Sequence, residues 1–126
     1  MSKHKVVHFE IPTADMKKSK SFYESVFDWK IESMDDSEYQ MATTTSSKDG
    51  MPTEMGGING GFYKRMSKND GPSIVIETDD LDKTIEAVEK AGGKISTPKH
   101  AIGEWGFMAD FTDPEGNQIG LWEMAK

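Results

Sequence analysis

An internal repeat is the feature that most constrains how this chain can fold. In the first half, the β-rich stretch Val6–Ile11 leads through a polar break into an amphipathic segment, and β-rich sequence resumes at Lys30-Ile31. The second half repeats this order between Ile74–Thr78 and Lys94-Ile95. Strand, capping acid and helix recurring in one order indicate a repeated supersecondary unit. The sequence therefore predicts two copies of one module.

Each module is expected to contain one helix and four strands. A stripe of residues at helical spacing marks each of the two helices, near 15–27 and 80–91. The stripe consists of Met16, Ser19, Tyr23, Val26 and Phe27 in the first, and of Leu81, Ile85 and Val88 in the second. Three strand-like segments follow each helix: Trp29–Ser33, Glu38–Thr43 and about 55–63, then Lys94–Thr97, Trp105–Thr112 and Asn117–Met124. The predicted fold class is α+β, with two tandem βαβββ modules at about 5–64 and 72–124 in a single domain over 1–126. The stretch 43–53 is either a flap over a site or a plain loop excursion.

Composition excludes several classes of function. The 126 residues carry a formal net charge of −7, which argues against binding to nucleic acid or to an anionic membrane surface. There is no cysteine, so disulfides and thiol nucleophiles are excluded. The first twelve residues contain no apolar run long enough for a signal peptide or membrane span. We therefore expect an acidic cytoplasmic protein.

Four stretches together resemble the vicinal oxygen chelate superfamily, which includes glyoxalase I, bleomycin-resistance proteins and extradiol dioxygenases. They are VVHFEIP at 6–12, FYESVFDW at 22–29, IETDDLDKTIEAVEKAGG at 76–93 and DPEGNQIGLW at 113–122. The resemblance implies one concave mixed sheet with both helices on its outer face and a cavity inside. It also implies a homodimer. Asp28 departs from the pattern, because the family usually has glycine there.

Strand alternation sorts the residues between the two faces of that sheet. Phe9, Ile76 and Leu121 are expected to pack under the helices. The expected cavity residues are polar or aromatic for the most part: His8, Glu10, Val75, Glu77, Gln118 and Trp122. An aromatic side chain among hydrogen-bonding groups is typical of small-ligand sites, so the expected partner is a small organic molecule.

The resemblance also implies where metal ligands would lie. The matching positions read Val6, Ser73 and Gly120, and the fourth falls in the glycine-rich stretch 56–61. Divalent ions need several histidine or carboxylate donors together, so we expect that the family's metal site is lost and that no cofactor is bound. A relocated metal site through His8, Glu10 and Glu77 is a weaker alternative.

Three classes of function remain open at this point. The first is a protein that binds a small organic ligand, as the bleomycin-resistance proteins do. The second is a glyoxalase-like lyase or isomerase with altered chemistry, for which His8, Glu10 and Glu77 are the candidate catalytic residues. The third is an interaction module that has kept the fold and lost the site. His8 and Glu10 are equally compatible with a purely structural role.

Overall fold

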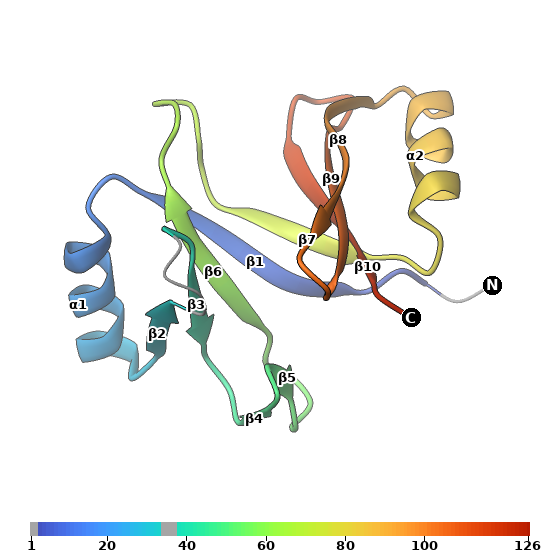
Figure 1. The fold of residues 1–126 in the computed structure, drawn as a ribbon. Helices are drawn as coiled ribbons and strands as arrows, with labels where there is room; N and C mark the ends of the chain where they lie inside the picture. Colours follow the sequence, from blue (N-terminus) through green and yellow to red (C-terminus); the bar gives the residue numbers. More distant parts are fainter. Residues whose placement is uncertain (1–2, 34–37) are drawn as a thin grey trace. The chain divides into compact units, whose positions relative to one another are not determined.

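The computed structural model describes residues 3–33 and 38–126, which form two compact units (Figure 1). The N-terminal unit comprises residues 8–72. The C-terminal unit comprises residues 73–126 together with the start of the chain up to Val7. Within the described residues, each unit contains one helix and a mixed four-stranded sheet. The expected α+β class with two tandem βαβββ modules is therefore confirmed.

The N-terminal unit has its first and last strands side by side. Its elements are β1 (Val6–Thr13), α1 (Met16–Phe27), β2 (Lys30–Ser33), β3 (Gln40–Thr43) and β6 (Asn59–Lys64). The strand order is β2-β3-β6-β1, with β6 parallel to β1 and the other pairs antiparallel. A parallel pair needs a crossover connection, and α1 supplies the helical part of it.

The C-terminal unit repeats this topology. Its elements are β7 (Ser73–Glu77), α2 (Leu81–Lys90), β8 (Lys94–Ile102), β9 (Gly106–Thr112) and β10 (Gln118–Met124). The order is β7-β10-β9-β8, and β10 runs parallel to β7. Strand β8 extends beyond the expected end at Thr97. It accommodates Pro98 because two register shifts interrupt its pairing with β9.

The joint between the first strand and the helix is built in the same way in both units. In the N-terminal unit the hydroxyl of Thr13 lies 2.6 Å from that of Ser19, one turn into the helix. In the C-terminal unit the hydroxyls of Thr78 and Thr84 lie 2.7 Å apart. Thr13 and Thr78, at or just after the ends of the two first strands, are both buried. The repeat seen in the sequence therefore extends to individual hydrogen bonds.

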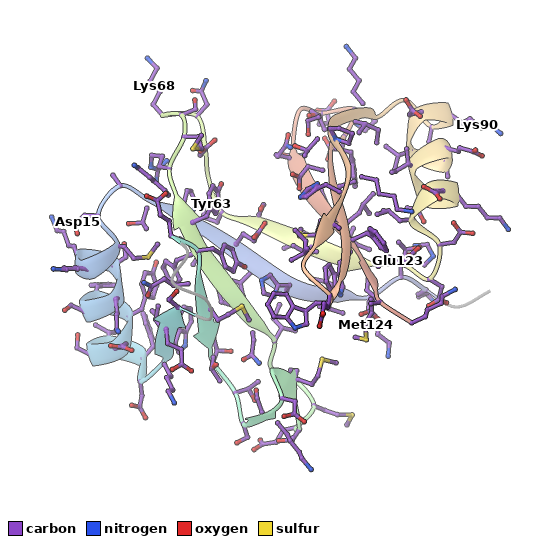
Figure 2. All side chains as sticks on the ribbon, viewed as in Figure 1. Asp15, Tyr63, Lys68, Lys90, Glu123 and Met124 are labelled. Atoms are coloured by element: carbon purple, nitrogen blue, oxygen red, sulfur yellow. The ribbon has the colours of Figure 1, made fainter. Side chains whose placement is uncertain are left out.

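An aspartate caps each helix, as expected. The side chains of Asp15 and Asp80 each accept a hydrogen bond at 3.1 Å from the backbone N–H three residues on. Figure 2 labels Asp15 at the start of α1. Helix α2 has a second cap, because Glu123 of β10 accepts a bond from the Leu81 N–H at 2.8 Å. Neither helix is long and apolar enough to span a membrane.

Each sheet buries one face against its helix, and we call this the helix face and the opposite one the distal face. The core of the N-terminal unit consists of Ile31, Ala42 and Phe62, with Phe9, Ile11, Met16, Tyr23 and Trp29 packed against it. The core of the C-terminal unit consists of Leu81, Ala109 and Leu121, with Ile76, Ile85, Val88, Phe107 and Phe111. The expected positions of Phe9, Ile76 and Leu121 are therefore confirmed.

The last turn of α1 corrects one expectation. Val26 and Phe27 were placed on the buried stripe, but they are 56% and 54% exposed. The indole of Trp29, directly after the helix, stacks on the Tyr23 ring with centroids 5.0 Å apart. The Phe27 ring packs on Tyr23 and Trp29, with centroids 6.0 and 5.8 Å apart, but about half of the residue stays exposed because Trp29 already covers this end of the core.

The stretch 43–53 is neither a bare excursion nor an unstructured flap. It contains a two-stranded hairpin, β4 (Ser47–Lys48) and β5 (Met51–Pro52). The buried side chain of Asn59 holds it by accepting from the Thr44 N–H at 2.9 Å and donating to the Ser47 hydroxyl at 2.8 Å. Strand β6 begins at Asn59, whereas the sequence predicted a start near residue 55.

Asp28 provides a test of the helix ending. It caps the C-terminus of α1 in the left-handed region, at φ 60° and ψ 30°. Glycine adopts this conformation without steric cost, whereas aspartate adopts it only at a steric cost. We therefore expect Asp28→Gly to raise the free energy of unfolding by about 0.5–1 kcal/mol in urea titrations. Asp28→Ala, the matched control, should lower it, and a gain in both variants would contradict this account.

Candidate functional site

A chain of three polar side chains lies on the distal face of the N-terminal unit. His8 and Glu10 are two residues apart on β1, and Tyr39 directly precedes β3. The His8 Nε2 atom and the Tyr39 hydroxyl lie 2.8 Å apart. The same hydroxyl is hydrogen-bonded to the Glu10 carboxylate. Tyr39 therefore links the two residues that the sequence had singled out.

Burial fixes the protonation of this chain. Desolvation lowers the pKa of His8 from 6.5 to about 4, so the imidazole is neutral at pH 7. Desolvation, and then the charge and hydrogen bond of Glu10, raise the pKa of Tyr39 well above its usual value. The phenol keeps its proton and donates it to Glu10, so His8 must donate its own proton from Nε2 to the phenol oxygen. Nδ1 is then the lone-pair nitrogen of His8.

A glycine makes room for the tyrosine. Gly61 of β6 pairs with Glu10 on one side and with Met41 on the other. A Cβ atom added at Gly61 would collide with the hydroxyl and ring of Tyr39. The absence of a side chain at Gly61 is therefore what lets the phenol lie over β6 and reach β1.

The other expected site residues belong to the C-terminal unit. Val75 is buried, and Gly120 lies between it and Asp110 in the register of the sheet. Glu77 and Trp122 are paired neighbours on β7 and β10. The Trp122 indole lies over Gly106, where an added Cβ would come within 2.8–2.9 Å of the ring. These residues occupy the distal face, in accord with the predicted alternation.

Gln118 lies at the start of β10 and is exposed. Its amide oxygen accepts a bond from the Thr112 hydroxyl at 3.0 Å, and its amide nitrogen donates to Ser96. These contacts tie together β10, β9 and β8 at one end of the sheet. The six expected residues thus divide into His8 and Glu10 in one unit and the remaining four in the other, and a single cavity lined by all six stays a prediction.

The positions matched to the family's metal ligands do not fit a divalent ion. Val6 and Gly120 carry no donor atom, and Ser73 offers a single hydroxyl. A Cβ at Gly120 would lie 3.1 Å from a Val75 methyl carbon, so the surroundings of that position are partly apolar. In the part of the chain that the structure describes, no three His, Asp or Glu side chains gather as metal ligands. Such ions require several strong donors, so no chemistry is assigned to a metal here.

Two polar residues of the distal faces were not predicted. Tyr39 precedes a strand of only four residues, and its partners lie far away in sequence, so no local pattern marks it. Asp110 could have been recognised, because it alternates with Phe107, Ala109 and Phe111 along β9.

The fit of Tyr39 over Gly61 can be tested by substitution. Gly61→Ala should lower the free energy of unfolding by about 1–3 kcal/mol, since the new methyl group displaces the phenol. When Tyr39→Ala is already present, Gly61→Ala should lower the free energy of unfolding by much less. Gly71→Ala is the control, because no atom lies within 4 Å of its added Cβ. Strictly additive effects in urea titrations would contradict the proposed fit.

The neutral state of His8 makes stability depend on pH. The unfolded chain takes up a proton near pH 6.5, whereas the folded chain resists it down to about pH 4. Stability should therefore fall as the pH decreases from 7 to 4, with His8 contributing up to about 3 kcal/mol of that fall. His8→Gln should flatten the dependence in denaturant titrations across this range, while substitution of the exposed His4 should leave it unchanged. Equal slopes for the native protein and His8→Gln would refute the assignment.

Comparison with proteins of known sequence identifies relatives over most of the chain. A putative glyoxylase of Mycobacterium bovis, CFP32, is 29% identical over 129 residues, covering 90% of this chain and 43% of that protein. A glyoxylase-like domain-containing protein of Didymella fabae is 33% identical over 90 residues, covering 68% of this chain and 66% of that protein. The chain thus spans less than half the length of the mycobacterial relative.

Solved structures share the fold at low identity. A hypothetical protein, BH1468 of Bacillus halodurans, matches with a TM-score of 0.68 at 15% identity, covering 99% of this chain and 97% of that one. Methylmalonyl-CoA epimerase of Mycobacterium tuberculosis matches with a TM-score of 0.60 at 18% identity, covering 96% and 88%. The model of the Glyoxalase/Bleomycin resistance protein/Dioxygenase superfamily matches residues 5–121. The chain belongs to this superfamily.

Proposed function

We propose that this protein binds a small organic molecule on its distal faces, without the divalent metal ion that many members of its family use. The observation that carries the proposal is the His8–Tyr39–Glu10 chain, in which a neutral imidazole is oriented by a phenol and a carboxylate. Small-molecule sites typically combine apolar walls with a few such placed polar groups. The ligand-binding set is His8, Glu10, Val75, Glu77, Gln118 and Trp122, with Tyr39 added.

The His8–Tyr39–Glu10 chain has a definite chemical capacity. With Nε2–H committed to Tyr39, Nδ1 of His8 can accept a hydrogen bond from an O–H or N–H group of the ligand. Glu10 holds the Tyr39 proton, so the imidazole keeps one tautomer and one orientation. Trp122 contributes an aromatic surface against which an apolar body can pack. In this proposal the protein is a cytoplasmic homodimer.

A second candidate is a lyase or isomerase of the glyoxalase type with altered chemistry. The observation in its favour is that a neutral histidine with its other nitrogen hydrogen-bonded is the usual arrangement of a general base. Solved structures of the same fold include methylmalonyl-CoA epimerases. In this reading, His8 Nδ1 would accept a proton from the substrate, and Tyr39 and Glu10 would orient the ring.

Binding can be tested by titrating the labelled protein with a library of small aromatic and aliphatic molecules in the presence of EDTA, observed by NMR. We expect ligands whose affinity falls about tenfold in His8→Gln and Tyr39→Phe, since each variant removes one member of the chain. Tyr23→Phe is the matched control, because it removes a phenol from the helix face and should leave affinity unchanged. Elemental analysis of the purified protein should find no stoichiometric metal.

The two candidates separate in the same set of experiments. The catalytic reading predicts turnover of the methylglyoxal–glutathione adduct or of methylmalonyl-CoA that is lost in His8→Gln, whereas the binding reading predicts none. One equivalent of metal per chain, released in His8→Ala, would contradict a metal-free site. Ligands that bind equally well to His8→Gln, Tyr39→Phe and the native protein would place the site elsewhere.

A further inference from the structure

Asp110 is a charged residue on the distal face of the C-terminal unit that the proposed ligand set does not include. Strand β9 turns Phe107, Ala109 and Phe111 toward α2, where they join the core. Asp110 lies between two of these residues and therefore points to the other face. It is partly buried, so it is accessible only in part.

The surroundings of Asp110 combine polar and apolar groups. In the register of the sheet, Asp110 lies between Thr97 of β8 and Gly120 of β10. The Thr97 side chain is hydrogen-bonded to the carboxylate. A Cβ atom added at Gly120 would lie 3.3 Å from Asp110 Oδ1, 3.1 Å from Val75 Cγ2 and 3.6 Å from Met108 Cε. The carboxylate, a valine methyl and a methionine methyl thus all border the space next to Gly120.

This environment favours the use of the carboxylate as an acceptor. Burial raises the pKa of Asp110, and the Thr97 hydrogen bond and the nearby charge of His100 lower it in part. An ionised carboxylate has about four acceptor sites, and Thr97 can fill only one of them. Further donors on a bound molecule would stabilise the charge that burial disfavours.

The two units also correspond at this position. Phe62 of β6 and Leu121 of β10 are both core residues on the strand that runs parallel to the first strand of the unit. The residue before each is a glycine on the distal face, Gly61 or Gly120. A polar side chain lies close to each glycine, Tyr39 in one unit and Asp110 in the other. Asp110 is paired with Gly120 as Met41 is paired with Gly61, so the two polar side chains reach their glycines from different positions on the neighbouring strand.

We propose that Asp110 is a second ligand-binding group, which accepts a hydrogen bond from a hydroxyl or N–H group attached to an apolar body. This inference rests on the proposed function and adds to it the chemical class of the ligand. The apolar body contacts Met108, which is partly exposed, and its donor reaches the Asp110 carboxylate. A molecule of the same shape without the donor would bury the carboxylate without compensation.

The test uses a matched pair of probes, benzyl alcohol and benzyl methyl ether, titrated into the labelled protein and followed by NMR. The native protein should prefer the alcohol about tenfold, as a hydrogen bond to a charged acceptor gives. In Asp110→Ala the preference should fall to within about twofold. Asp110→Asn keeps one acceptor oxygen and should retain part of the preference for the alcohol. Tyr23→Phe should retain the whole preference.

A direct readout separates ligand binding from a purely structural role. The carboxyl carbon resonance of Asp110 should move when the alcohol is added and stay in place with the ether. An equal preference in the native protein and Asp110→Ala, or no preference in either, would overturn the inference and leave the proposed function standing. If neither probe bound the native protein, the inference would be overturned for this ligand class, and the library titration would decide the proposed function separately.

Discussion

The parallel pairing of the first and last strands in each unit is the constraint on which the rest of the structure depends. Two parallel strands cannot be joined by a tight turn, so the chain must cross over between them. In both units the crossover begins with a helix that packs on one face of the sheet. Because the helix covers one face, the residues of each strand alternate between a helix face and a distal face. The crossover explains why a threonine, a capping aspartate and a helix follow β1 and β7 in the same arrangement.

The sequence was most informative where the structure is local. Alternation along β1, β7 and β10 placed Phe9, Ile76 and Leu121 correctly, because a strand has a fixed period of two residues. Aspartate caps were equally readable, since a cap acts within one turn of helix. Helical spacing predicted that Val26 and Phe27 are buried, and this was wrong. The spacing does not report that Trp29 already covers that end of the core.

The distal faces were only partly predictable, and for a physical reason. His8 and Glu10 could be placed together because they are two residues apart on one strand. Tyr39 reaches them across β6, and this contact depends on Gly61, more than twenty residues further along the chain. A glycine in a sequence does not reveal which side chain will use the space it leaves. Tyr39 was therefore missed because its position depends on a missing side chain elsewhere.

The attachment of the β4–β5 hairpin through Asn59 has a consequence for how this family can diversify. Asn59 holds the segment through the backbone N–H of Thr44 and the hydroxyl of Ser47, near its beginning. At the tip, Asn59 reaches only the backbone carbonyl of Gly50, at 3.5 Å, and no side chain from residue 48 to residue 56 bonds to Asn59. Insertions and substitutions there would leave the sheet and its anchor intact. The hairpin is thus a segment in which new recognition sequences can arise by mutation while the fold is conserved.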